Sequence, residues 1–435
     1  MEQLLVKAKE LADEAEVFRV SSERTLVHFE ANHLKQIQNK QHVSIALRII
    51  KQGRIGFSAA TGCVNAQTLL DMALDTSQFG APANFSFPAS AAYPQVEVFD
   101  PETDKLTVEK MVELGEHLVA RVREHTPDIL CEADVTKEVV FFNILNSKGG
   151  EASYCKSLSS LNLEGLVVHD TDMLFVGDGE SSCHLLVDFN VVADRVIEQL
   201  ELAGNKATAS TGSSSVIFTP RGAASALVAP LVTAFNGKMV LEGASPLRSK
   251  LGERVFDKKF SLWDNAILPY HVASRPCDDE GVPSQSILLV GEGVVSNFLY
   301  DLQTAALANT RSAGNGIRAR GGLPGPGISS LIVGEGDVSL QDMVADMKEG
   351  LIVEQLMGAE QGNLLAGDFS GNALLGYRVK GGEIVGRVKD TVVSGNVYEA
   401  LERIVAVGRE SRWVGGVLRL PYLYCSNLSL GTKGG

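Results

Sequence analysis

The sequence predicts an α+β protein: an N-terminal mixed sheet with helices on one face, followed by a C-terminal, largely antiparallel β domain with inserted helices. Three observations lead to this prediction. The 435 residues are too many for one ordinary hydrophobic core, so two domains are expected. The 43 glycines and the low aromatic content of 6% suit many tight turns between strands. Alternating apolar and polar residues occur in both halves, whereas helical periodicity is confined to a few segments.

The chain is expected to begin with one helix and then a run of strands. Apolar residues of segment 1–15 recur with helical spacing, which predicts an amphipathic helix. Residues 25–62 instead alternate apolar and polar side chains, with turn-like breaks at 31–32, 39–40 and 52–53. These breaks predict a meander of four strands.

Two further helices and more strands complete the N-terminal half. Asn65 can cap a helix that extends to about Phe79. Residues 101–125 repeat apolar side chains with a period of 3.6 and predict another helix. Because strand patterns return over residues 129–188, we expect residues 1–203 to form the N-terminal domain, a sheet with its helices on one face.

A small, polar segment without aromatic residues, 204–215, is the predicted linker. The C-terminal domain is then expected to cover residues 216–435. Its first helix, over residues 221–237, contains Pro230, which removes a backbone hydrogen bond and should kink the helix.

The rest of the C-terminal domain is expected to consist of hairpins with two short helices between and after them. Segments 284–301 and 376–389 each read as two strands around a glycine turn. Ser339 is the expected cap of one helix, with Gly350 as its stop signal, and Asn396 is the expected cap of the other.

Composition narrows the class of protein. The formal net charge is −14 and no dense basic run occurs, which argues against binding to nucleic acid. The longest nearly apolar run, residues 223–235, falls short of the ~20 residues that cross a bilayer. The first residues lack the pattern of a signal peptide, and the six cysteines form no CxxC pair. We therefore expect a cytoplasmic protein with reduced thiols and no membrane contact.

Common catalytic and binding motifs are missing from the sequence. There is no GxxxxGK[ST], no GxSxG and no HExxH. The glycine-rich segment 312–322 could hold an anion on backbone N–H groups, or it could be a plain loop that needs positive φ angles. The spacing of His28, His33 and His42 does not place them together on one face, so a zinc site of three histidines is not expected.

The segment RPCDDEG carries three consecutive carboxylates, Asp278, Asp279 and Glu280, between Cys277 and Gly281. Carboxylates beside a thiol could hold a metal ion. Consecutive side chains point in different directions, however, and aspartates favour turns because they bond nearby N–H groups. Taken alone, the motif predicts a turn that leads into a strand, and both structural and functional roles remain open.

Several segments, in their order, resemble the TldD/PmbA family, which is also described as modulators of DNA gyrase. No single segment is specific, but together they extend over nearly the whole chain. The resemblance implies a two-component peptidase in which a TldD-type chain pairs with a PmbA/TldE-type chain. The segments that carry the resemblance are LRIIKQGRIGFSAATG (47–62), CDDEG and its continuation (277–309), SAGNG (312–316), LIVGEG to LMG (331–358) and GDFSG to ERI (367–404).

In that family the TldD-type chain bears a zinc-binding HExxxH early in its C-terminal domain and a cysteine ligand near its end. The corresponding helix here, AASALVAPLVTAF (223–235), holds neither histidine nor glutamate, and no histidine occurs between Leu185 and Tyr270. Cys425 lies in a segment that resembles the PmbA type. The chain is therefore expected to be the PmbA/TldE-type half, with no cofactor of its own and with zinc in its TldD-type partner.

The resemblance also implies partners and a site. The expected partners are a TldD-type subunit, or a second copy in a homodimer, and unfolded peptide. The chain would be the non-catalytic half that completes a chamber and helps to bind peptide. The alternative is a stand-alone homodimer that binds peptide or protein without hydrolysis, and a direct DNA effector is disfavoured by the charge of −14. The residues expected at the cleft or interface are Asp278, Asp279, Glu280, Gly281, Gly314, Asn315, Gly316, Asp368 and Ser370.

Overall fold

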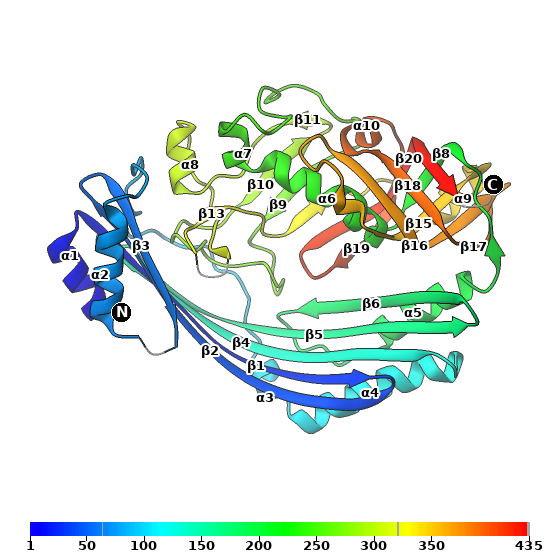
Figure 1. The fold of residues 1–435 in the computed structure, drawn as a ribbon, viewed down its shortest axis with the longest axis horizontal. Coiled ribbons are helices and arrows are strands. Elements are labelled where there is room, and N and C mark those ends of the chain that lie inside the picture. Colours follow the sequence, from blue (N-terminus) through cyan, green and yellow to red (C-terminus); the bar gives the residue numbers. More distant parts are fainter. Residues whose placement is uncertain (63, 320–321, 433–435) are drawn as a thin grey trace.

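The molecule consists of two stacked β layers, with a long curved N-terminal sheet lying along one side of the C-terminal domain (Figure 1). The computed structural model describes residues 1–62, 64–319 and 322–432. Its strands are mostly antiparallel and helices accompany both sheets. This architecture confirms the predicted α+β class.

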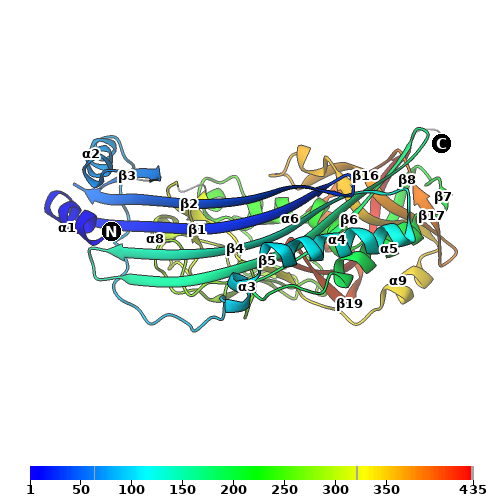
Figure 2. The ribbon, with the colours of Figure 1, turned by 90° about the horizontal axis from the view of Figure 1, so that it is seen from below.

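The N-terminal sheet has six strands, and each strand pairs antiparallel with its neighbour. Four of the strands are long enough to run the length of the molecule (Figure 2). In sheet order they are β3 (Arg54–Thr61), β2 (His33–Lys51), β1 (Glu14–Glu30), β4 (Leu130–Asn146), β5 (Glu151–His169) and β6 (Asp172–Ser182).

The predicted four-strand meander is wrong, because residues 14–61 form three longer strands. The turns at 31–32 and 52–53 are present, with positive φ at Ala31, Asn32 and Gln52. The expected break at 39–40 lies inside β2, where both residues pair with β1. Polar residues there sit on an exposed part of a regular strand, so their polarity did not indicate a turn.

The N-terminal helices are α1 (Glu2–Leu11), α2 (Ala66–Ser77), α3 (Pro101–Lys105), α4 (Val108–His125) and α5 (Asn190–Leu202). Asn65 caps α2 as predicted, with its side chain accepting a hydrogen bond from the Gln67 N–H. The helix expected over residues 101–125 is instead two helices. Each has its own cap, Asp100 for α3 and Thr107 for α4.

The two faces of the N-terminal sheet have different neighbours. Ala15 and Val17 of β1 pack in a core with α1 and α2, and Phe29, on the same face, packs with α4. Side chains of alternate residues, among them Glu16 and Phe18, point to the other face, toward the C-terminal domain. The helices therefore lie on one face as predicted, and the opposite face is available to the C-terminal domain.

The C-terminal domain is built around a ring of five strands, because β8, β15, β16, β18 and β20 pair successively and β20 returns to β8. Further strands extend this sheet, and β12 and β13 form a separate short pair. The strands are β7 (Lys206–Ala207), β8 (Gly212–Phe218), β9 (Leu262–Asn265), β10 (Ser286–Gly291), β11 (Val294–Val295), β12 (Gly316–Ile317), β13 (Gly325–Pro326), β14 (Leu331–Val333), β15 (Glu349–Met357), β16 (Asp368–Lys380), β17 (Glu383–Val388), β18 (Thr391–Asn396), β19 (Ile404–Val414) and β20 (Leu418–Thr432).

The C-terminal helices are α6 (Pro220–Phe235), α7 (Gly237–Leu241), α8 (Leu302–Leu307), α9 (Leu340–Asp346) and α10 (Val397–Glu402), with a 3-10 turn at Ala359–Gln361. Helix α6 packs against the ring strands, and it remains one helix through Pro230. The predicted hairpins β10–β11 and β16–β17 and the caps Ser339 and Asn396 are present. The predicted stop at Gly350 is wrong, because α9 ends at Asp346 and Gly350 belongs to β15.

The segment predicted as a linker, residues 204–215, contributes β7 and the start of β8. The two halves also share a buried cluster that includes Val196 of α5 and Tyr377 of β16, and the Tyr377 hydroxyl donates to the Gln199 carbonyl of α5 at 3.4 Å. The domain division at residues 203 and 216 stays a prediction. Among the described residues, no helix is both long and apolar enough to cross a bilayer.

Candidate functional site

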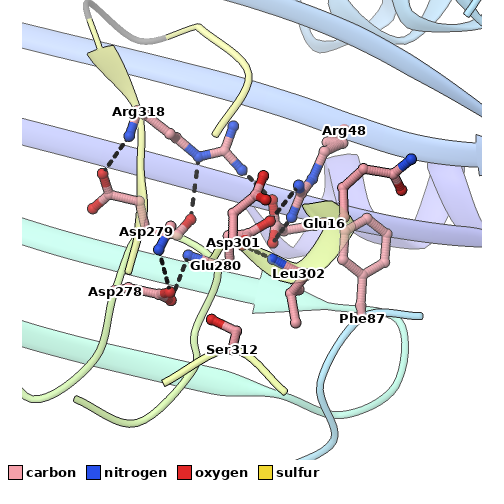
Figure 3. A network of polar contacts seen from close by, with 12 residues as sticks. Glu16, Arg48, Phe87, Asp278, Asp279, Glu280, Asp301, Leu302, Ser312 and Arg318 are labelled. Carbon is pink, nitrogen blue, oxygen red and sulfur yellow. Dashed lines mark hydrogen bonds and ion pairs between the residues drawn. The ribbon is translucent and has the colours of Figure 1, made fainter. Parts of the chain in front are cut away.

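The DDEG motif lies where the C-terminal domain meets one end of the N-terminal sheet (Figure 3). It forms a tight turn, because the Asp278 N–H donates to the Val282 carbonyl at 3.0 Å. Gly281 closes the turn with φ of 75°, a region that favours glycine. Asp278 and Glu280 are buried, so this is not a solvated turn.

Asp278 joins this turn to the glycine-rich segment. One carboxylate oxygen accepts the N–H groups of Glu280 and Val282 at 3.0 and 2.9 Å. The other accepts the Gly316 N–H at 2.8 Å. Burial and the neighbouring Glu280 raise the pKa of Asp278 to about 8, while N–H donors from Val282 and Gly316 act in the opposite direction. The side chain thus links two loops rather than facing solvent.

Four buried charges then connect the two halves of the protein in an alternating chain. Arg48 of β2 donates to Glu280 at 2.6 Å and to Glu16 of β1 at 2.9 Å. The second Glu16 oxygen accepts a hydrogen bond from the Arg318 guanidinium. Glu280 uses its other oxygen to accept the Leu302 N–H at 2.7 Å. Each carboxylate therefore has two partners, and the chain closes the interface at this end (Figure 3).

Aromatic rings enclose the two arginines of this chain. Phe85 and Phe87 lie 5.0 and 4.9 Å from the Arg48 guanidinium, and Phe18 lies 5.0 Å from that of Arg318. Burial opposes the charge of Arg48, but Glu16 and Glu280 outweigh it and hold the pKa of Arg48 above its ordinary value. These charges are already paired with one another, which gives the motif a structural role.

The predicted loop residues Gly314, Asn315 and Gly316 belong to the same assembly. Gly314 has φ of 89°, and the Asn315 amide donates to Asp264 at 2.8 Å. A Cβ atom on Gly316 would lie 2.4 Å from Glu280 Oε2, so a side chain cannot be accommodated there. The expected anion-binding N–H groups exist, but they bind the protein's own carboxylates, as Gly316 does with Asp278. Residues 320–321 of this segment lie outside the described residues.

The remaining predicted residues, Asp368 and Ser370, lie on β16 and pair with β18. Asp368 accepts a hydrogen bond from the Asn396 amide at 2.9 Å. Over the described part of the chain, no hydrogen bond joins Asp368 or Ser370 to the DDEG assembly. The structure therefore brings seven of the nine predicted residues together and leaves these two apart.

A second feature, which the sequence did not indicate, is a cavity of about 360 Å³ between the two sheets. Its walls come from the ends of β1, β4 and β5, from β6, and from the start of α6. Glu132, Glu164 and Phe175 line one side, and Arg221 lines the other. Because side chains alternate between the two faces of a strand, the sequence could have shown that these residues share a face of the sheet. Nothing in the sequence shows which part of the protein lies across from that face.

Helix α6 is the element at which the family resemblance leads one to look for zinc donors. Its residues, Pro220–Phe235, include no histidine, cysteine, aspartate or glutamate. Cys425 is buried in the apolar core beside Val216, and burial raises its pKa to about 12, which disfavours the thiolate that binds zinc. Within residues 1–62, 64–319 and 322–432, no group of His, Cys, Asp or Glu is arranged to hold a metal. The side chains at this place do not fit a zinc site.

Comparison with known proteins accounts for this fold. Residues 211–432 match the PmbA/TldA metallopeptidase C-terminal domain, and residues 15–75 match domain 1 of the same metallopeptidases. The chain belongs to the PmbA/TldD family. The expected family is thereby confirmed, with more than half of the chain inside a single family domain.

Two relatives and two solved structures align with nearly the whole chain, and a third relative aligns with less than half of it. An uncharacterized protein of Methanocaldococcus jannaschii is 24% identical over 93% of this chain and 94% of its own length. A metalloprotease of Methanothermobacter thermautotrophicus is 23% identical over 94% and 91%. Metalloprotease PmbA of Escherichia coli is 30% identical over 46% and 42%. The crystal structure of TldE from Thermococcus kodakarensis, 23% identical, superposes with a TM-score of 0.87 over 99% of both chains. A proposed modulator of a DNA gyrase from Thermotoga maritima, 22% identical, gives 0.88 over 99% of both.

Proposed function

We propose that this chain is the PmbA/TldE-type, non-catalytic subunit of a zinc peptidase that acts on unfolded peptides. The observation that carries the proposal is helix α6, which lies inside the segment matched to the family's C-terminal domain and presents no zinc donor. The family description as metallopeptidases and the relatives named metalloprotease support the reaction class. A zinc-bearing TldD-type partner would supply the activated water.

In this proposal the chain shapes and lines the chamber. Strand β6 ends the N-terminal sheet, and β19 pairs with β20 and, through the single bridge of Gly408 with Val338, with the segment before α9. The two strands contact each other, and both line a small pocket at the start of α6 that shares Arg221 with the larger cavity. Strand edges can bind an extended peptide through main-chain hydrogen bonds, with little dependence on sequence. This property suits a subunit that presents unfolded peptide to a partner.

Reconstitution tests the proposal. The purified chain, a TldD-type relative from the same organism and their mixture are each given a fluorescently labelled, unstructured peptide, with and without EDTA. We expect cleavage by the mixture that EDTA abolishes, a heterodimer by mass measurement, and zinc in the relative alone. EDTA-sensitive cleavage by this chain alone would overturn the non-catalytic assignment.

The second candidate is a stand-alone homodimer that binds peptide or protein without hydrolysis. The same lack of zinc donors on α6 favours it. A homodimer that persists after mixing with the relative, together with peptide binding and no gain in cleavage, would support this candidate against the first.

A further inference from the structure

The cavity between the sheets lies at the opposite end of the interface from the charge chain of Glu16, Arg48, Glu280 and Arg318. Its N-terminal wall is the inward face of the sheet, near the ends of β1 and β5 and the start of β4. Its other wall is formed by Arg221, Gln355 and Leu374 of the C-terminal domain. With a volume of about 360 Å³, it can receive side chains of a ligand.

The inward wall has an apolar strip. Leu130, Leu166 and Phe175 stand directly opposite one another on β4, β5 and β6. Leu130 and Phe175 are 47% and 40% exposed, which is unusual for large apolar side chains aligned on one face. The strip therefore offers apolar contact area that the folded chain itself does not cover.

A row of carboxylates runs beside this strip. Glu132 and Glu164 are opposite each other on β4 and β5, two residues along each strand from Leu130 and Leu166. Like charges directly opposite one another destabilise a sheet. In the described part of the chain, no Lys, Arg or His makes an ion pair with either side chain, whereas Glu30 beside them pairs with Lys35 at 3.1 Å. Within residues 1–62, 64–319 and 322–432, the row therefore presents negative charge without a paired counterion.

The opposite wall does not neutralise the row. Arg221 is the cation there, and its guanidinium donates to the Gln355 side chain at 3.3 Å. It also lies near Glu354, whose pKa is raised to about 7 by burial and lowered in part by Arg221. Arg221 is thus engaged on its own side of the cavity, and the carboxylates of Glu132 and Glu164 remain available to a ligand.

We propose that this cavity binds an extended peptide in which a lysine or arginine stands two residues from a large apolar side chain. Residues i and i+2 of an extended chain lie on one face, ~7 Å apart, which is the spacing between the carboxylate row and the apolar strip. The cation would then meet Glu132 and Glu164 while the apolar side chain covers Leu130, Leu166 and Phe175. This inference rests on the proposed function, since it specifies which unfolded peptides the subunit selects.

The test uses the full chain and fluorescein-labelled peptides of Gly and Ser that contain one Lys and one Leu. In the first peptide these are two residues apart, in the second they are adjacent, and in the third Glu replaces Lys. Affinity is measured by fluorescence anisotropy at low and at high salt. We expect the first peptide to bind about fivefold more tightly than the other two, and this preference to shrink with salt.

Matched variants locate the effect. Glu132→Gln with Glu164→Gln should reduce binding of the first peptide about fivefold, whereas Glu116→Gln with Glu124→Gln, on the exposed side of α4, removes the same charge and should leave binding unchanged. Phe175→Ala should weaken binding, whereas Phe141→Ala should not, because Phe141 is also exposed, at 50%, but lies on the opposite face of the sheet. Equal affinity for all three peptides, or equal effects of variants and controls, would overturn the proposal.

The reconstituted complex separates this inference from the proposed function. If the complex forms and cleaves peptide, but Glu132→Gln with Glu164→Gln leaves its preference for the first peptide unchanged, the inference fails and the proposed function stands. If no complex forms while the chain alone shows the expected peptide preference, the proposed function fails and the cavity assignment stands.

Discussion

The two ends of the inward sheet face use the same residue type in opposite ways. At one end Glu16 is fully buried and bonded to Arg48 and Arg318. At the other end Glu132 and Glu164 are exposed and face each other, and no cation of the described residues forms an ion pair with them. A buried carboxylate requires partners because removal from water is costly, whereas an exposed one does not. One end of the interface is thus permanently closed and the other is open to a ligand.

The largest expected loss of stability tests the closed end of the interface, where Glu16 is buried between two arginines. Glu16→Gln replaces one acceptor oxygen with an NH2 group that faces a guanidinium, and it leaves buried positive charge uncompensated. We expect a loss of about 3–5 kcal/mol in the free energy of unfolding, measured with urea. Glu23→Gln, on an exposed part of the same strand, should change it by less than about 0.5 kcal/mol. Similar values for both variants would show that the charge chain does not hold the interface.

The close approach at Gly316 provides a second test of that end. Gly316→Ala would place a Cβ atom 2.4 Å from Glu280 Oε2 and force the loop away from the charge chain. We expect a loss of about 3 kcal/mol in the free energy of unfolding. Gly325→Ala is the matched control, because Gly325 lies in the facing strand β13 and no atom of the described residues lies within 4 Å of its would-be Cβ. A tolerated Gly316→Ala would mean that the loop is not tightly held.

The pH dependence of stability tests the region beside the cavity. Burial raises the pKa of Glu354 to about 7, with Arg221 and Arg412 opposing the shift and Asp178 adding to it. The folded state therefore binds this proton more tightly than the unfolded state, so the contribution is complete below about pH 4.5 and is lost as pH rises through about 7. We expect the difference in unfolding free energy between the wild type and Glu354→Gln to change by about 3 kcal/mol over this window. A difference that is constant with pH would contradict the assignment.

The smallest expected change in the free energy of unfolding is a gain, whereas Glu16→Gln and Gly316→Ala should cause losses. Glu164→Gln removes one of two like charges that face each other across β4 and β5, so it should stabilise the protein by about 0.2–1 kcal/mol. Thermal unfolding at low salt measures this gain, which should fade as salt rises. A loss of stability comparable to that of Glu16→Gln would erase the contrast between the two ends.

Local signals in the sequence predicted much of the fold. The caps Asn65, Ser339 and Asn396 and the glycine turns of the hairpins act through neighbouring residues, so they could be identified without the structure. The break expected at 39–40 failed because pairing with β1 overrides the weak strand preference of polar residues. The pairing of β2 with β1 therefore determines the structure at residues 39–40, and the local sequence does not indicate this pairing.

The candidate site was predicted only in part for the same reason. The DDEG and SAGNG segments were expected to share a site, and Asp278 does bond to Gly316. Their partners Glu16 and Arg48 lie more than 200 residues away in the chain, and nothing in the spacing of the two segments indicates them. Glu132 and Glu164 look like ordinary exposed strand residues, and only the opposing domain gives them a cavity.

The place of β20 in the ring has a consequence for how the chain folds during its synthesis. Strand β20 pairs with β8, β14, β18 and β19, so β8, the first strand of the ring in chain order, can pair fully only after residues 418–432 have been made. During synthesis the C-terminal half cannot complete its ring before residues 418–432 have been made, and its unpaired edges stay open to aggregation until then. A polypeptide truncated before Leu418 should therefore depend on chaperones to remain dispersed.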